Sequence, residues 1–224
     1  CAGMDLSAFS NGVDDIPDDK KPDHARVGEV LYRTAKELQG YISKLEEIRV
    51  PVIAAVHGGV IGGALDLITA CDMRFASNDA FFCIQEINIG MAADVGTLQR
   101  LPKIIPDSKM REMAYTGRRM LADEAKDSGL VGEVYETQDQ MLDAVHKLAA
   151  EIASKSPVAI YGLKAVMNYS RDHNVSDSLD FNALWSGAML SQTDMAEAMT
   201  AQMEKRDADF DKMVDVKKFN ESKS

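Results

Sequence analysis

Apolar residues recur every three or four positions along residues 24–48, which is the spacing of one face of an α-helix. The run PVIAAV that follows is short and continuously apolar, so it predicts a buried strand. Four glycines come next, and ALDLITA after them predicts a short helix. The first organised part of the chain is therefore expected to read helix, strand, glycine-rich turn and helix.

Strand and helix patterns alternate for a short distance and then give way to helices. DMRFAS and AFFCI predict strands, DVGTLQRLPKII predicts the beginning of a helix, and LVGEVYE predicts one further strand. The expected later helices cover residues 106–117, 121–128, 137–154, 157–170 and 176–206. The pattern thus predicts mixed α/β structure followed by a largely helical C-terminal region.

Composition and charge argue against several classes of function. With 224 residues, 46% of them hydrophobic, the chain can bury a sizeable core. Its net charge of -11 disfavours a nucleic-acid partner, and no apolar run approaches the roughly 20 residues of a membrane span. Cys1, Cys71, Cys83 and the four histidines lack the spacing of metal ligands, so we expect no metal site and a reducing compartment.

The stretch HGGVIGGALDLITACD, residues 57–72, places four glycines beside one acid, Asp66, in an otherwise apolar run. Its spacing is neither that of a dinucleotide-binding loop nor that of a P-loop, which disfavours a nucleotide phosphate. Two interpretations stay open on spacing alone. The glycines either let a helix pack tightly on a strand, or expose backbone N–H groups as an oxyanion hole, which stabilises negative charge formed during a reaction.

Three acids lie among apolar residues in a short part of the chain. Asp66 falls in the first turn of the helix predicted after the glycines, Glu86 follows the strand AFFCI, and Asp94 lies at an expected helix start. Each has an ordinary explanation, either as a stabiliser of a helix N-terminus or as a solvated strand end. Together they predict proton transfer next to a polarised carbonyl group, because burial and mutual repulsion let a carboxyl pair divide the roles of base and acid.

Four stretches resemble the crotonase (enoyl-CoA hydratase/isomerase) superfamily, in the order CAGMDL, PVIAAVHGGVIGGALDLITACDMRFAS, AFFCIQEINIGMAADVGTLQRLPKII and ADEAKDSGLVGEVY. The resemblance implies an α/β fold with a crotonase-like spiral of ββα units over residues 1–135. It also implies a helical C-terminal region, residues 136–224, that builds trimer contacts. Since the family carries a first ββα unit before CAGMDL, we expect this chain to be part of a longer enzyme and to fold poorly alone.

The resemblance implies an acyl-CoA thioester as substrate and no cofactor, coenzyme A being part of the substrate. The N–H groups of Met4 and Gly63 correspond to the oxyanion hole of the family. The implied substrate-binding residues are Ala2, Gly3, Met4, Asp5, Leu6 and Gly63.

Asp66, Glu86 and Asp94, with AADVGTLQRLPK, resemble the Δ3,5-Δ2,4-dienoyl-CoA isomerase branch, which acts in the beta-oxidation of unsaturated fatty acids. The implied mechanism has Glu86 remove a proton from C2 of a 3,5-dienoyl-CoA and Asp94, in an apolar pocket, deliver one at C6. Asp66 would orient the pair. A hydratase-like enzyme and a non-catalytic acyl-CoA-binding relative stay open as alternatives.

The resemblance also bears on assembly and location. It implies a homotrimer or a hexamer made of two trimers, and the C-terminal third carries more apolar positions than one helix needs to cover itself, including Leu184 and Trp185. We expect the protein in the matrix of mitochondria or of peroxisomes.

Overall fold

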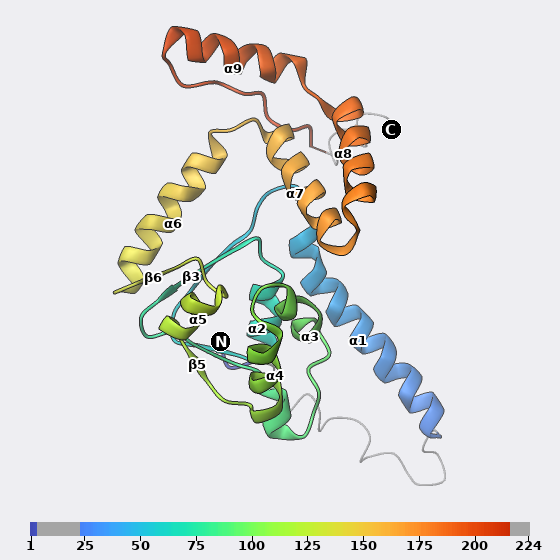
Figure 1. The fold of residues 1–224 in the computed structure, drawn as a ribbon. Helices are drawn as coiled ribbons and strands as arrows, with labels where there is room; N and C mark the ends of the chain where they lie inside the picture. Colours follow the sequence, from blue (N-terminus) through green and yellow to red (C-terminus); the bar gives the residue numbers. More distant parts are fainter. Residues whose placement is uncertain (4–22, 216–224) are drawn as a thin grey trace. The chain divides into compact units, whose positions relative to one another are not determined.

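The computed structural model describes residues 1–3 and 23–215. The chain divides into two compact units, one of residues 1–46 with 52–145 and the other of residues 47–51 with 146–224 (Figure 1). This division falls later in the chain than the expected boundary after residue 135. Within the described residues, no helix is both long enough and apolar enough to cross a membrane.

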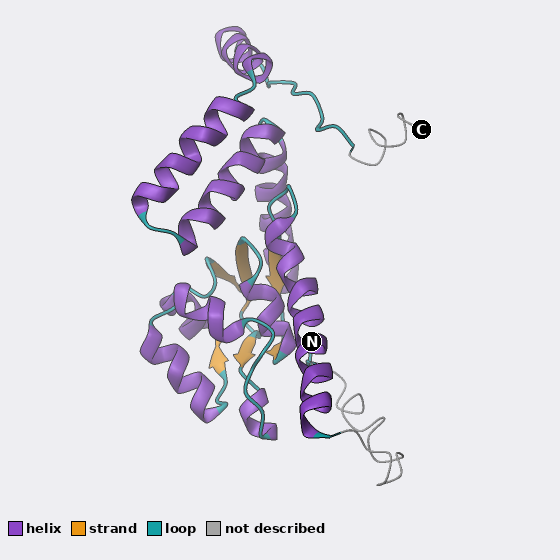
Figure 2. Cartoon of the chain, turned by 90° about the vertical axis from the view of Figure 1, so that its right-hand side faces the viewer, coloured by secondary structure: helices purple, strands orange, loops and turns teal. Residues whose placement is uncertain are grey.

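The first unit contains two small sheets, whose strands are orange in Figure 2. Their strands are β1 (Ile53–Val56), β2 (Gly59–Ile61), β3 (Met73–Ser77), β4 (Phe81–Cys83), β5 (Met120–Leu121) and β6 (Glu133–Tyr135). One sheet has the order β1-β3-β6 and is entirely parallel. The other has the order β2-β4-β5, in which β2 and β4 are parallel and β5 is antiparallel to β4. The parallel pairs require the crossover connections that separate the strands along the sequence.

Short helices connect these strands, and a long one precedes them. The helices of the first unit are α1 (His24–Glu47, whose last residue belongs to the second unit), α2 (Gly63–Thr69), the 3-10 turns η3 (Glu86–Ile89) and η4 (Leu101–Lys103), α3 (Thr97–Arg100), α4 (Asp107–Thr116) and α5 (Ala122–Ser128). Both α4 and α5 end at a glycine with positive φ, Gly117 and Gly129, as expected of helix C-termini that need a left-handed residue.

The core of the first unit forms where β2, β4 and the short helices meet. Phe82 of β4 and Leu65 of α2 are fully buried, and Met113 and Met120 pack into the same cluster. Both Cys71 and Cys83 are buried, as expected for thiols in apolar surroundings. This packing fixes the end of β2 and the beginning of α2, which carry the candidate site.

The second unit is helical. Helix α6 (Gln138–Ala153) begins in the first unit, and α7 (Pro157–Asp172), α8 (Val175–Met189) and α9 (Gln192–Glu204) follow it. Helices α7 and α8 pack side by side (Figure 1), with the ring of Tyr161 edge-on to that of Trp185 at 4.9 Å between centroids. Gly162 permits this approach, because a Cβ there would lie 2.4 Å from the indole nitrogen of Trp185.

Most expected elements are present, and three expectations were wrong in detail. The helix expected over residues 176–206 is two helices, because Ser191 accepts a hydrogen bond from the Asp194 N–H and starts α9 anew. The glycine-rich turn contains strand β2, and β5 was not expected at all. The helix expected from DVGTLQRLPKII has one turn before a 3-10 turn at Pro102, which lacks the N–H that a continuing α-helix requires.

Candidate active site

All three predicted carboxyl side chains line one cavity of about 80 Å³ in the first unit. Its lining residues come from the segment before residue 4, the β2–α2 junction, η3 and the loop before α3. They are Ala2, Gly3, Gly62, Gly63, Asp66, Gln85, Glu86, Ile89, Met91, Asp94 and Val95. A cavity of this size accommodates the reacting part of a ligand rather than a whole acyl-CoA.

Two adjacent glycines, Gly62 and Gly63, line this cavity and differ in the hydrogen bonds of their N–H groups. Gly62 has φ 57° and ψ -124°, and its N–H donates to the Cys83 carbonyl at 3.0 Å, which joins β2 to β4 beyond their paired residues. Gly63 begins α2, and no described residue accepts a hydrogen bond from its N–H. That N–H is therefore available to a ligand oxygen.

The segment before residue 4 lies beside these glycines. The Ile61 N–H donates to the Cys1 carbonyl at 3.2 Å, and a Cβ on Gly3, whose φ is +90°, would lie 3.2 Å from the Ile61 carbonyl oxygen. Ala2 and Gly3 thus line the cavity, and their binding of substrate stays a prediction. Met4, Asp5 and Leu6, including the second predicted oxyanion donor, fall outside the described residues.

Asp66 is the most enclosed of the three acids. It lies in the first turn of α2 as predicted and is only 1% exposed, and its Oδ1 accepts a hydrogen bond from the Thr97 N–H at 2.6 Å. Burial raises the pKa of the Asp66 carboxyl, while its contacts with Thr97 lower that pKa. The charge of Asp94 raises it further and that of Arg100 lowers it.

Glu86 follows β4 closely and begins η3, so its carboxyl group approaches the Gly62 backbone. It is half-buried, unlike a solvated strand end. Burial raises the pKa of the Glu86 carboxyl, and the negative charges of Asp66 and Asp94 raise it further. A carboxylate whose ionised form is disfavoured in this way is a stronger base than a solvated one.

The expected surroundings of Asp94 were wrong. Helix α3 begins at Thr97 with Gly96 as its N-cap, so Asp94 lies in the preceding loop and not at a helix start. It is exposed at the edge of the cavity instead of enclosed in an apolar pocket. Its backbone carbonyl accepts a hydrogen bond from the Gln39 side chain of α1 at 2.7 Å, which ties this loop to the long helix.

This arrangement can remove a proton from one position of a ligand and return one at another. Two carboxyl groups with raised pKa values face the cavity, and a third opens to solvent beside them. In the part of the chain that the structure describes, no three His, Cys, Asp or Glu side chains are arranged to hold a metal ion. The chemistry that these residues support is proton transfer.

Sequence patterns did not predict the residues that form hydrogen bonds with Asp66 and Asp94. Thr97 donates to Asp66 and Gln39 donates to the Asp94 carbonyl, but neither forms part of a periodic pattern. Arg100 pairs with Glu46 of α1 at 2.7 Å. The motif DVGTLQRLPK begins at Asp94 and contains Thr97 and Arg100. Its resemblance to the family was the one sequence signal that could have pointed to these two residues.

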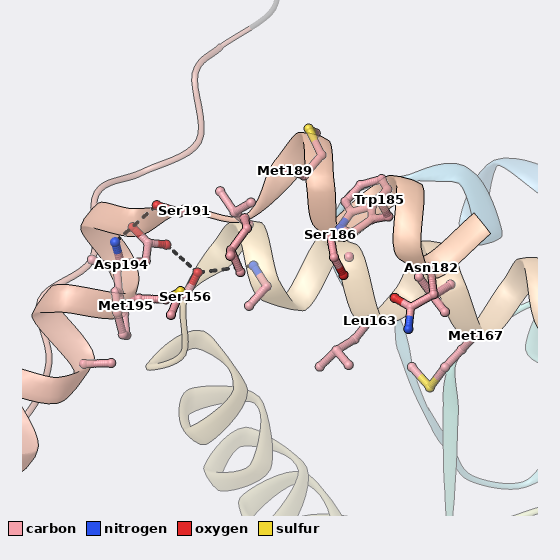
Figure 3. Close-up of a pocket in the computed structure, with 17 residues that line it drawn as sticks. Ser156, Leu163, Met167, Asn182, Trp185, Ser186, Met189, Ser191, Asp194 and Met195 are labelled. Carbon is pink, nitrogen blue, oxygen red and sulfur yellow. Dashed lines mark hydrogen bonds between the residues drawn. The ribbon is translucent and has the colours of Figure 1, made fainter. Parts of the chain in front are cut away.

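A larger hollow of about 480 Å³ lies in the second unit between α7, α8 and α9 (Figure 3). Two of its polar groups serve helix ends, since the Ser156 hydroxyl donates to Asp194 and accepts from the Ala159 N–H. Most of its other lining side chains are apolar, among them Leu163, Met167 and Met189. Among its described lining residues the one carboxyl group, that of Asp194, is engaged by Ser156, so the hollow offers no pair of acids like that of the first unit.

Comparison with known sequences identifies a family and several relatives. A family model described as enoyl-CoA hydratase/isomerase matches residues 2–213. The mitochondrial Delta(3,5)-Delta(2,4)-dienoyl-CoA isomerase of Rattus norvegicus is 47% identical over 208 residues, which cover 92% of this chain and 63% of the relative. The peroxisomal Delta(3,5)-Delta(2,4)-dienoyl-CoA isomerase of Arabidopsis thaliana is 44% identical over 213 residues, which cover 95% and 76%. The chain thus spans less than two thirds of the length of the rat relative.

Solved structures agree on the fold. An enoyl-CoA hydratase from Bacillus anthracis superposes with a TM-score of 0.80 at 27% identity, over 94% of this chain and 76% of that one. A probable enoyl-CoA hydratase/isomerase from Mycobacterium abscessus gives a TM-score of 0.75 at 32% identity, over 82% and 71%. The fold class predicted from the sequence is confirmed by these neighbours.

Proposed function

Because the chain belongs to the enoyl-CoA hydratase/isomerase family, we propose that it isomerises 3,5-dienoyl-CoA to 2,4-dienoyl-CoA in the beta-oxidation of unsaturated fatty acids. One observation carries the proposal: Asp66, Glu86 and Asp94 line a single cavity that the Gly63 N–H borders. The names of the rat and Arabidopsis relatives support the same reaction. Every proton transfer in it can be assigned to a side chain of the cavity, so the proposal includes no cofactor.

In the first step, Glu86 removes a proton from C2 of the substrate. The electron pair of the broken C–H bond spreads over the diene and onto the thioester oxygen, where the Gly63 N–H donates to the developing negative charge. The N–H of Met4 is the proposed second donor. Burial and the neighbouring acids raise the pKa of Glu86, which strengthens it as a base for this weakly acidic proton.

In the second step, Asp94 delivers a proton to C6. Protonation at C6 leaves double bonds at C2 and C4, so one proton is removed, one is added and the product is an isomer of the substrate. The exposure of Asp94 is useful here, because the residue can exchange protons with solvent between turnovers. Asp66, which lines the same cavity, orients the pair of Glu86 and Asp94.

An ultraviolet assay with 3,5-octadienoyl-CoA tests the proposal, because the conjugated 2,4-dienoyl thioester absorbs at longer wavelength. We expect the absorbance to rise with time for the full-length protein and Glu86→Gln to abolish the rise. Release of 3-hydroxyacyl-CoA from a simple 2-enoyl-CoA, without isomerisation, would instead identify a hydratase. Acyl-CoA binding without any turnover, unchanged by Glu86→Gln, would identify a non-catalytic relative.

The proposal includes assembly into a homotrimer or a hexamer of two trimers. The second unit leaves many large apolar side chains exposed, and several of them line the hollow of Figure 3. They are Leu163, Met167, Leu179, Leu184, Met189, Leu190, Met195 and Met199. Light scattering at micromolar concentration is expected to give three or six copies, and a stable monomer would refute this part of the proposal.

The proposed location is the matrix of mitochondria or of peroxisomes. The rat relative is named mitochondrial and the Arabidopsis relative peroxisomal, which supports either compartment. Fluorescence microscopy of the tagged full-length protein against markers of both organelles distinguishes them, and a diffuse cytosolic signal would contradict both.

A further inference from the structure

Thr97 reaches the most buried acid of the site from a separate part of the chain. It is the first residue of α3 and is 2% exposed, and its N–H donates to Oδ1 of Asp66 at 2.6 Å. No other hydrogen bond to the Asp66 carboxyl is formed by the described residues. The orientation of this carboxyl group therefore depends on Thr97.

The Thr97 side chain adds a second, unusual feature. Its hydroxyl oxygen is buried and has no hydrogen-bond partner among the described residues. Buried polar groups are rarely left unpaired, because removal from water without a new partner is unfavourable. The Asp66 carboxyl lies close by, and the Thr97 hydroxyl lowers the pKa of this carboxyl. The hydrogen of the Thr97 hydroxyl rotates freely, so this group can turn its hydrogen toward an ionised carboxylate and donate to it.

We propose that Thr97 is the positioning residue of the active site, whose N–H and hydroxyl together hold the Asp66 carboxylate in place and in its ionised form. The inference rests on the proposed function, since it assigns the role of Asp66 within the same site. A carboxylate only accepts hydrogen bonds, whereas a protonated carboxyl group must also donate one, so two donors from Thr97 favour the ionised form.

The charge that Thr97 maintains acts on the proposed base. The groups that face Asp66 are Glu86 from η3, Asp94 from the loop before α3 and Arg100 from α3. The negative charge of Asp66 raises the pKa of Glu86. If Asp66 were protonated, its charge would no longer raise the pKa of Glu86, and Glu86 would be a weaker base. Thr97 therefore acts on proton removal through Asp66, without touching the substrate.

The test removes the hydroxyl without removing the N–H. Thr97→Val keeps the shape of the side chain, Thr97→Ser restores the hydroxyl, and Thr97→Ala removes it if the valine variant does not fold. The control is Thr69→Val, because the Thr69 hydroxyl is equally buried but donates to the backbone carbonyl of Asp66. Two quantities are measured on the full-length protein. They are the pH dependence of kcat/KM for 3,5-octadienoyl-CoA and the titration of Asp66 by carbon-13 NMR of labelled aspartate, assigned with Asp66→Asn.

Loss of the hydroxyl removes a donor to the Asp66 carboxylate and raises the pKa of Asp66. Because Asp66 and Glu86 interact, they titrate as a pair, and the first proton that the pair takes up then binds at higher pH. In Thr97→Val, we expect the acid limb of kcat/KM and the NMR titration to move upward by about one pH unit, the effect of one hydrogen bond to a carboxylate. Thr97→Ser should restore both curves, and Thr69→Val should move neither.

The two measurements separate this inference from the proposed function. An NMR titration that shifts in Thr97→Val and returns in Thr97→Ser supports the inference even if the chain does not isomerise the substrate. An unshifted titration in a folded Thr97→Val variant overturns the inference, whatever the activity. An equal loss of activity at every pH, with no shift, would show that Thr97 is only part of the packing.

Discussion

The strongest structural test of the site is to add one methyl group at each of two adjacent glycines. Gly62 has φ 57° and ψ -124°, which lies outside the left-handed region that alanine can adopt at modest cost. A Cβ at this position would also lie 3.2 Å from Oε1 of Glu86, closer than an ordinary van der Waals contact. Gly63, one residue later, begins α2 with an ordinary φ, and a Cβ there would meet no atom within 4 Å.

The two variants should therefore differ in stability. Gly62→Ala forces a residue with a side chain into a strained backbone conformation, which costs about 1 to 3 kcal/mol and lowers Tm by roughly 2 to 12 °C. Gly63→Ala should leave Tm unchanged or raise it slightly, because alanine is the better helix former by up to about 1 kcal/mol.

The effect of Gly62→Ala on the chemistry follows from the same contact. The Glu86 carboxyl group must move by a few tenths of an ångström, and a misplacement of about 1 Å costs about 10²-fold in rate, so we expect kcat to fall roughly 3- to 10-fold. Calorimetry gives Tm and the ultraviolet assay gives kcat. Equal loss of stability in the two variants would refute the argument, since only Gly62 carries the strained backbone.

Three further predictions concern the acids and the second unit. Glu86→Gln should abolish isomerisation yet raise Tm at neutral pH, because burial raises the pKa of Glu86 and its ionised form therefore opposes folding. Calorimetry should show that this gain in Tm vanishes below about pH 4.3, where glutamate is protonated in both the folded and the unfolded protein. Asp94→Asn should lower kcat by roughly 10² with little change in KM, and near-normal steady-state kinetics would exclude Asp94 as the acid at C6. Gly162→Ala should destabilise the second unit by about 1 to 3 kcal/mol because the new Cβ would overlap Trp185, whereas Gly187→Ala should not, since a Cβ there would meet no atom within 4 Å. Denaturant unfolding of the two variants, followed by the fluorescence of Trp185, the only tryptophan, measures the difference.

The sequence predicted those parts of the fold that depend on local patterns. The helix over residues 24–48 and the helix after the glycines were predictable, because their apolar positions repeat with helical spacing. The break between α8 and α9 was missed because apolar spacing continues across it and only the side chain of Ser191 restarts the helix. Strand β5 was missed because two residues are too short for any period, and it forms only because β4 is there to pair with it.

The site was predicted in its residues more than in its geometry. The family motifs placed Asp66 and Glu86 at one cavity with Gly63, and the structure brings them together there. The exposure of Asp94 could not be read from the sequence, since it depends on how the loop before α3 lies against Gln39 of α1. The support of Asp66 by Thr97 also depends on a contact between residues far apart in sequence, which no periodicity encodes.

The parallel pairing of β1, β3 and β6 has a consequence for the time course of folding. Ile53 lies opposite Met73, but the next pairing in the sheet joins Phe75 to Glu133, so the third strand joins only after a long intervening segment has been synthesised. During that interval the outer edge of β3 has free N–H and carbonyl groups, and such an edge can pair with the wrong strand. Contacts of this sequence separation also slow the closure of the sheet. The growing chain therefore passes through a period in which the segments that carry Asp66 and Glu86 have been synthesised but the sheet of β1, β3 and β6 is incomplete. Shielding of the open edge by a chaperone has its greatest effect during that period.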